Sequence, residues 1–153
     1  MHPNVERVSA ELRARGAAGS VRELAVAATT AALAAEALGV EVGAIANSLI
    51  FASTEPVLVL ASGRHRVDTG RVAALLGLPS LERANPAYVR QHTGQTIGGV
   101  APVGHPTPLR TVVDTALADY PVVWAAAGVA HTVFDTSYAE LLAITGGTPA
   151  EVG

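Results

Sequence analysis

The sequence predicts one mixed α/β domain of short strands and short helices, and three observations support this. The chain has 153 residues, 50% hydrophobic and 15% charged, which is enough for one core in a single domain spanning residues 1–153. Apolar runs of strand length alternate with segments of helical periodicity. Several strands follow one another at hairpin spacing, which favours a mixed or largely antiparallel sheet over a doubly wound parallel one.

Capping residues mark the expected helices. The first helix is expected over residues 3–15, where Val5, Val8 and Leu12 share one face that can pack on the domain. An N-cap side chain precedes each later helical segment, and glycine follows most of them. These segments are residues 31–38 after Thr30, 69–76 after Asp68, 86–93 after Asn85, one turn from Asp114 to Asp119, and 138–145 after Ser137.

Six or seven short strands are expected between these helices. They are residues 21–26, 42–51, 57–60, 81–84, 109–113, 122–127 and 132–134. In the second strand, alternation places Asn47 on the same face as Ile45 and Leu49, and Ser48 on the other face.

Composition excludes several kinds of chemistry. The chain has no cysteine, and its ten basic residues are all arginine, so a cysteine nucleophile and lysine Schiff-base chemistry are excluded. The histidines lack metal-ligand spacing, and we expect neither a metal nor a cofactor. A net charge of −3 argues against a broad DNA-binding face. No signal peptide or membrane-spanning run is present, so we expect a cytoplasmic protein.

Asn47 and a glycine-rich loop are the most informative candidate site residues. An unpaired amide on an apolar strand face costs about 1–3 kcal/mol, so Asn47 needs a partner, either neighbouring backbone or a ligand. Gly98 and Gly99 allow backbone to approach a ligand closely, and Pro102 stiffens the loop. Such a loop can present backbone amides to a phosphate or carbonyl, although a simple turn is the commoner reason for a Gly-Gly pair.

Other polar residues are weaker candidates. His131 lies between two expected strands and could overhang a pocket, or it could be an exposed turn residue. Residues 64–66, Arg-His-Arg, could contact RNA phosphate or form a solvated loop. Asp68 and Asp114 are explained as helix caps, and Ser48 has no nucleophile motif around it.

Four segments in order resemble the YbaK/prolyl-tRNA editing family: TTAALAAEALGVEVGAIANSLIF, PVLVLASGRHRVDTGRVAALLG, HTGQTIGGVAPVGHP and VVWAAAG. GGVAPVG matches the family's Gly-x-x-x-Pro loop at Gly98 and Pro102. The resemblance implies a curved, partly barrel-like sheet with surrounding helices, and a freestanding deacylase that clears misacylated tRNA, in particular prolyl tRNA carrying a smaller amino acid. In such a deacylase the backbone amides of the loop from Gly98 to Pro102 would bind the ester carbonyl, and the ester would be hydrolysed by water or with help from the substrate's own hydroxyl or thiol. It implies catalytic roles for Asn47, Gly98 and Gly99, and substrate binding by Ser48, Val100, Ala101, Pro102, Gly128 and His131.

The sequence departs from the family pattern at one position. The pattern has lysine immediately before Ser-Leu, and this chain has Asn47, which can donate a hydrogen bond but carries no charge. The alternative to a deacylase is therefore a binding module for an aminoacyl-nucleotide or tRNA end that has lost catalysis. The implied partners are the 3′ end of an aminoacyl-tRNA and a synthetase, with the protein a monomer or weak homodimer.

Overall fold

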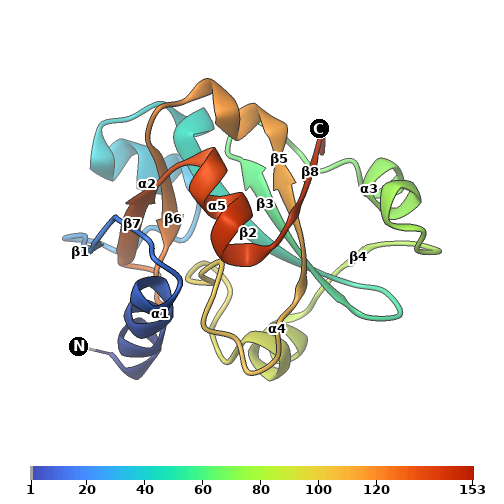
Figure 1. Ribbon diagram of the computed structural model, residues 1–153, viewed down its shortest axis with the longest axis horizontal. Coiled ribbons are helices and arrows are strands. Elements are labelled where there is room, and N and C mark those ends of the chain that lie inside the picture. Colours follow the sequence, from blue (N-terminus) through green and yellow to red (C-terminus); the bar gives the residue numbers. More distant parts are fainter. Residues whose placement is uncertain (1) are drawn as a thin grey trace.

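The computed structural model describes residues 2–153, in which five α-helices surround one eight-stranded sheet (Figure 1). The helices are α1 (Pro3–Ala14), α2 (Ala31–Leu38), α3 (Thr69–Leu76), α4 (Pro86–Thr93) and α5 (Tyr138–Thr145). The strands are β1 (Val21–Glu23), β2 (Ile45–Ala52), β3 (Pro56–Ser62), β4 (Glu82–Arg83), β5 (Arg110–Asp114), β6 (Val123–Ala126), β7 (Thr132–Thr136) and β8 (Thr148–Ala150). Two 3₁₀ helices, η1 (Val42–Ala44) and η2 (Thr115–Asp119), complete the fold.

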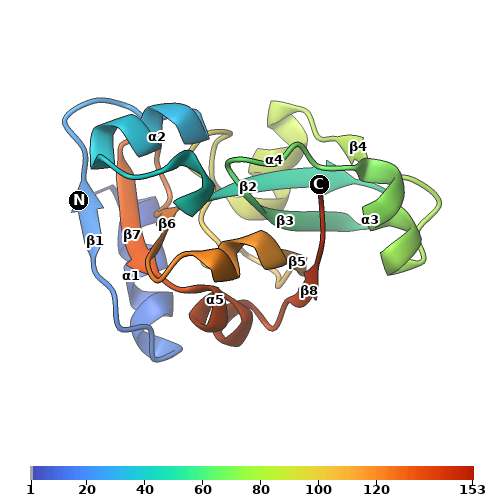
Figure 2. The ribbon, with the colours of Figure 1, turned by 90° about the horizontal axis from the view of Figure 1, so that it is seen from above.

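The sheet is mixed, mostly antiparallel and open. Its strand order is β1-β7-β6-β2-β3-β5-β8, and β4 forms an additional pair with β2. The β2–β3 hairpin is the longest ladder, and it joins the rest of the sheet through parallel pairs with β6 and β5. Figures 1 and 2 place α1 and α2 at the end of the molecule that holds β6 and β7, and α3 at the opposite end.

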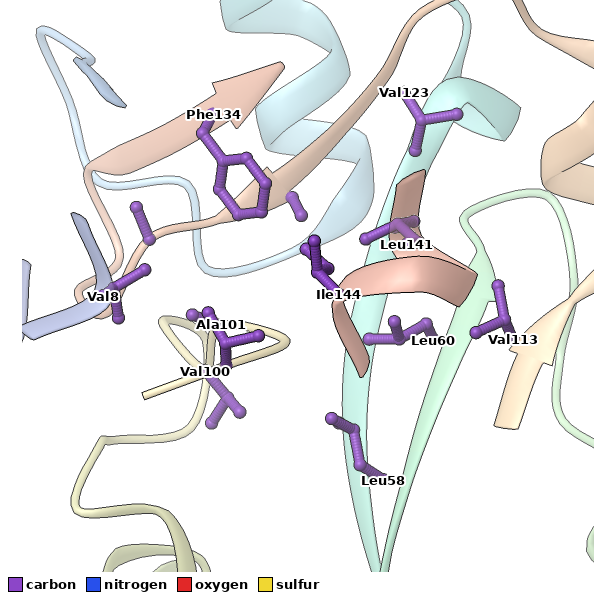
Figure 3. Packing of buried hydrophobic residues seen from close by; sticks show 14 of the residues in the cluster. Val8, Leu58, Leu60, Val100, Ala101, Val113, Val123, Phe134, Leu141 and Ile144 are labelled. Atoms are coloured by element: carbon purple, nitrogen blue, oxygen red, sulfur yellow. The ribbon is translucent and has the colours of Figure 1, made fainter. Parts of the chain in front are cut away.

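The two faces of the β2–β3 hairpin belong to different parts of the core. Leu58 and Leu60 point into the main cluster, with Leu141 and Ile144 of α5 (Figure 3). Val57 and Val59 point to the other face, where they pack with α3. Apolar packing therefore covers both faces of β3, and this explains why residues 57–60 form a continuous apolar run.

The structure confirms the predicted fold class and the positions of the helices, and it corrects some details of the sheet. The sheet has eight strands where six or seven were expected. The additional strand is β8, which sequence patterns did not indicate because Pro149 lies between Thr148 and Ala150; a proline is tolerated in such a short terminal strand. Residues 42–44 form η1 and not the start of a strand. The Ala44 N–H donates to the Glu41 carbonyl oxygen at 3.0 Å, which closes the turn. Glycine is needed at position 43 because a Cβ there would lie 2.0 Å from the Tyr120 hydroxyl oxygen.

Within residues 2–153, none of the helices has the length and apolar character needed to cross a membrane.

Candidate functional site

A cleft of about 550 Å³ opens beside the middle of β2. Four segments bound it: β2 itself, the start of α2, the turn after β3, and the glycine-rich loop that follows α4. They contribute residues 47–51, 29–31, 65–67 and 97–98, together with Thr69, Arg83, Ala84, Val89 and Val100. The predicted pairing of Asn47 with the glycine-rich loop in one pocket therefore agrees with the lining of this cleft.

Among the strands of residues 2–153, none pairs with the middle of β2 on the edge that faces the cleft. β6 pairs with β2 only at residues 45–46, and β4 pairs with it only at residues 51–52. The Ala84 N–H donates to the Ile50 carbonyl oxygen at 3.2 Å, so the main-chain groups of Ile50 point to this edge. Main-chain groups alternate between the two edges of a strand, so the N–H and C=O of Ser48 also point to this open edge.

Gly98 brings the glycine-rich loop against the start of α2. Its φ of +90° is a conformation that favours glycine, and a Cβ at this position would lie 3.3 Å from the Thr29 Cα. No acceptor for the Gly98 N–H is found among residues 2–153. Glycine is therefore needed here both for backbone conformation and for close packing.

The next three backbone N–H groups of the loop differ in their partners: the first and third donate to acceptors within the protein, and the second does not. The Gly99 N–H donates to the Thr96 carbonyl oxygen at 3.0 Å, and the Ala101 N–H donates to Gln95 Oε1 at 2.7 Å. For the Val100 N–H, between them, the part of the chain that the structure describes offers no acceptor. The amides that can bind a ligand are therefore those of Gly98 and Val100.

Asn47 and Ser48 supply the polar side chains of the open edge. The Asn47 side chain is half-buried, lines the cleft, and makes no hydrogen bond within residues 2–153. The Ser48 Oγ is buried, and within the same residues it also has no hydrogen-bond partner. Because the Asn47 amide is partly exposed, water or a ligand can serve as its partner, which leaves the ligand interpretation open.

A small chamber of about 40 Å³ adjoins the cleft. Asn47, Ser48, Gly98 and Val100 line both cavities, so the two meet at the open edge of β2. The remaining lining is mainly alanine: Ala28, Ala31, Ala34, Ala46, Ala125, Ala126 and Ala130. A cavity needs roughly 10–15 Å³ to hold one water molecule, so the chamber has room for a small group.

The other predicted site residues lie outside both cavities. Gly99 packs against Val129, Ala101 is fully buried, and Pro102 lines a separate cavity next to Arg15. Gly128 packs against Asn4, and His131 is exposed on the turn between β6 and β7. Of the nine predicted positions, the structure brings together Asn47, Ser48, Gly98 and Val100.

The charged residues of the cleft are all basic. The Arg-His-Arg segment is divided between three environments: Arg64 binds Asp119 at 2.7 Å, His65 binds Asp114, and Arg66 lines the cleft. Within residues 2–153, neither Arg66 nor Arg83 forms an ion pair, and no carboxylate lines the cleft. The cleft therefore favours an anionic ligand.

Gln95 positions the loop and was missed by pattern analysis. It is 1% exposed, and besides accepting from Ala101 it donates to the Val103 carbonyl oxygen at 3.4 Å. Periodicity gives no signal for such a residue, because it follows a helix C-cap in an irregular segment. No group of three or more histidine and acidic side chains in residues 2–153 is arranged to hold a metal.

The sequence and the fold match a known class of domain. The model of the aminoacyl-tRNA editing domain matches residues 25–144, and the chain belongs to this family.

Particular relatives narrow the comparison. The chain is 35% identical over 133 residues to proline--tRNA ligase of Xanthomonas campestris pv. campestris strain 8004, covering 82% of this chain and 24% of the ligase. It thus spans about a quarter of that enzyme. It is also 28% identical to the uncharacterized protein YwhH of Bacillus subtilis, covering 79% of this chain and 78% of YwhH.

Solved structures extend the likeness over the whole chain. A crystal structure of a protein proposed to be a trans-editing enzyme for prolyl tRNA synthetase aligns with a TM-score of 0.92 and 44% identity, covering 99% of this chain and 98% of the other. The hypothetical protein APE2540 aligns with a TM-score of 0.88 and 29% identity, covering 95% and 98% of the two chains.

Proposed function

We propose that this domain is an aminoacyl-tRNA deacylase that acts in trans and clears prolyl tRNA carrying an amino acid smaller than proline. The observation that carries the proposal is the pair of uncommitted N–H groups of Gly98 and Val100, which line the cleft beside the open edge of β2. Membership of the editing-domain family and the likeness to a trans-editing protein support it.

These two amides donate hydrogen bonds to the ester carbonyl oxygen of the aminoacyl group. As water attacks, negative charge develops on the carbonyl oxygen, and fixed backbone donors stabilise it without reorganising. The carbonyl oxygen of Ser48, which points to the open edge of β2, is a suitable acceptor for the α-ammonium group. Asn47 adds a neutral donor, which stabilises charge less than a lysine would.

The small chamber supports the choice of amino acid. A side chain of one or two heavy atoms can enter the alanine-lined space of about 40 Å³, and the larger ring of proline fits it less well. Hydrophobic pockets discriminate by size at about 10- to 200-fold per methylene group, and they reject larger groups by steric overlap. We therefore expect proline tRNA that carries proline not to be hydrolysed.

The basic residues support binding of a tRNA end. Arg66 and Arg83 line the cleft and have no acidic partner among the described residues, so both are free to contact phosphates of the 3′-terminal nucleotides. The chain carries a net charge of −3, so we expect the contact to be confined to this cleft.

A deacylation assay tests the proposal. Proline tRNA charged with alanine, serine, cysteine or proline is incubated with the protein, and loss of the ester is followed over time. We expect hydrolysis of one or more of the smaller aminoacyl esters, and hydrolysis of the prolyl ester at the buffer rate. If no ester is hydrolysed faster than in buffer, the enzyme proposal is wrong. Binding of a non-hydrolysable 3′-alanylamido-adenosine without any turnover would then establish the binding module.

A further inference from the structure

A histidine and a buried aspartate form a hydrogen-bonded pair at the wall of the cleft. The His65 Nδ1 lies 2.8 Å from Asp114 Oδ2. The aspartate side chain is 0% exposed, whereas that of the histidine is 30% exposed and lines the cleft. Sequence patterns explained Asp114 only as the N-cap of η2, a role that its other carboxylate oxygen performs through the Ala116 N–H.

The surroundings of Asp114 determine which ring nitrogen carries the proton. Its Oδ1 accepts from the Ala116 N–H at 3.0 Å, and its Oδ2 accepts from the Ser62 N–H at 3.0 Å. A carboxylate oxygen only accepts, so in the neutral ring the His65 Nδ1 must donate to it. The Nε2 therefore carries the lone pair, and no partner for it is found within residues 2–153.

Strand register places this pair close to the open edge of β2. Asn47 lies opposite Ala61 in the β2–β3 ladder, and Leu60 lies opposite Val113 in the β3–β5 ladder. One residue further along both strands, Ala61 lies opposite Asp114. One face of the sheet thus carries a row of three residues, Asn47, Ala61 and Asp114. The two ends of the row are two strand spacings apart, which is about 10 Å.

The His65 ring enters this row from the turn after β3. Ala61, between the two polar ends of the row, is buried and packs in the apolar cluster of β3 and α3. The ring contacts Asp114 at one end of the row and lines the same cleft as Asn47 at the other.

We propose that His65 is the general base of the deacylation, with Asp114 as its positioning residue. This proposal rests on the proposed function. Water forms a bond to the ester carbonyl carbon while its proton passes to His65 Nε2, and the carbonyl π electrons move to the oxygen. As the tetrahedral intermediate collapses, the C–O bond to the ribose breaks and the imidazolium returns the proton to the leaving ribose oxygen. Asp114 remains a carboxylate throughout and stabilises the imidazolium.

Two substitutions separate the roles of the two ring nitrogens. In His65→Asn the amide nitrogen can replace Nδ1 as donor to Asp114, and the Nε2 base is removed. In His65→Gln the amide reaches the Nε2 position, where it can hydrogen-bond water but cannot take its proton. We expect kcat to fall about 100-fold or more in both, since a positioned base contributes about 10²- to 10⁴-fold. His92→Asn, a histidine of α4 that does not line the cleft, is the control.

Binding and chemical rescue complete the test. The Kd of 3′-alanylamido-adenosine, which has an amide in place of the ester, should stay within about threefold of wild type in His65→Asn. Added imidazole should restore at least a tenth of wild-type kcat to His65→Ala. An unchanged kcat in His65→Asn or His65→Gln overturns the base role, as does a loss of affinity equal to the loss of kcat/KM. An inactive wild type instead overturns the proposed function itself.

Discussion

Gln95 fixes the Ala101 amide from inside the protein, because its buried Oε1 accepts from the Ala101 N–H at 2.7 Å. This bond closes the base of the loop that carries Gly98 and Val100. Gln95→Ala leaves the Ala101 amide without its partner, at about 1–3 kcal/mol of unfolding free energy. We expect that loss in urea unfolding, together with lower kcat. Gln91→Ala, on the exposed side of α4, should change neither quantity; equal effects of both substitutions would contradict this role.

Gly98→Ala should lower deacylation sharply. The substitution adds a Cβ at a φ of +90° and 3.3 Å from the Thr29 Cα, so the loop must shift relative to α2. The left-handed conformation alone costs about 1–2 kcal/mol. Gly16→Ala is the matched control, since its φ is +79° and a Cβ there meets nothing within 4 Å. Both variants should lose similar stability by thermal unfolding, and only Gly98→Ala should lose kcat/KM by about tenfold or more.

Arg66→Ala and Arg83→Ala should weaken tRNA binding in a salt-dependent way. Each phosphate contact removed should reduce the slope of log K against log salt concentration by about 0.7 to 1. Filter binding or fluorescence titration from low to moderate salt measures the slope. Arg13→Ala, on α1 and away from the cleft, should leave the slope unchanged. Identical slopes for all three variants would show that the tRNA end does not use this cleft.

Ala126→Val should narrow the small chamber and change substrate preference. Ala126 lines the chamber from β6 and is half-buried, so the strand can accept a branched residue without disturbing the core. We expect kcat/KM for proline tRNA charged with alanine to fall about tenfold, and kcat/KM for proline tRNA charged with glycine to fall less. Ala52→Val, on β2 outside the chamber, is the control. A uniform fall for both substrates would place the amino acid side chain elsewhere.

His105 should make stability depend on pH. Burial lowers the pKa of His105 below its ordinary value, and the nearby Arg15 acts in the same direction, against the opposing effect of the Ala101 carbonyl. Below about pH 6.5 the unfolded chain binds a proton that the folded chain takes up less readily, so unfolding free energy falls as pH is lowered. Above that pH the contribution is fully present.

A comparison of wild type with the His105→Gln variant isolates the contribution of His105 to stability. Wild type and His105→Gln are unfolded in urea from pH 7.5 to pH 5, and their difference is plotted, so that carboxylates common to both cancel. Wild type should lose more stability than the variant on acidification. A constant difference across this range would contradict the role of His105.

Local sequence determined the helices. Thr30 and Gly39 bound α2, and Asn85 and Gly94 bound α4, as their residue types predict. These signals are reliable because a cap bonds to an amide two or three residues away, so all the interacting groups are adjacent in the chain. The same local order, in the segments that resemble the editing family, indicated the family and the pocket-forming loop.

The tertiary structure determined which groups line the cleft. The Ser48 edge is open because β6 and β4 end their pairing with β2 on either side of it, and those strands lie far away in the sequence. The His65–Asp114 pair joins residues separated by 49 positions, and the Gly99 carbonyl oxygen accepts from the N–H of Gly128, which is far away in the sequence. Residue type showed that Asn47 and the glycine loop could bind a ligand. Which amides face it, and which histidine accompanies them, followed only from strand register and long-range packing, which no local pattern encodes.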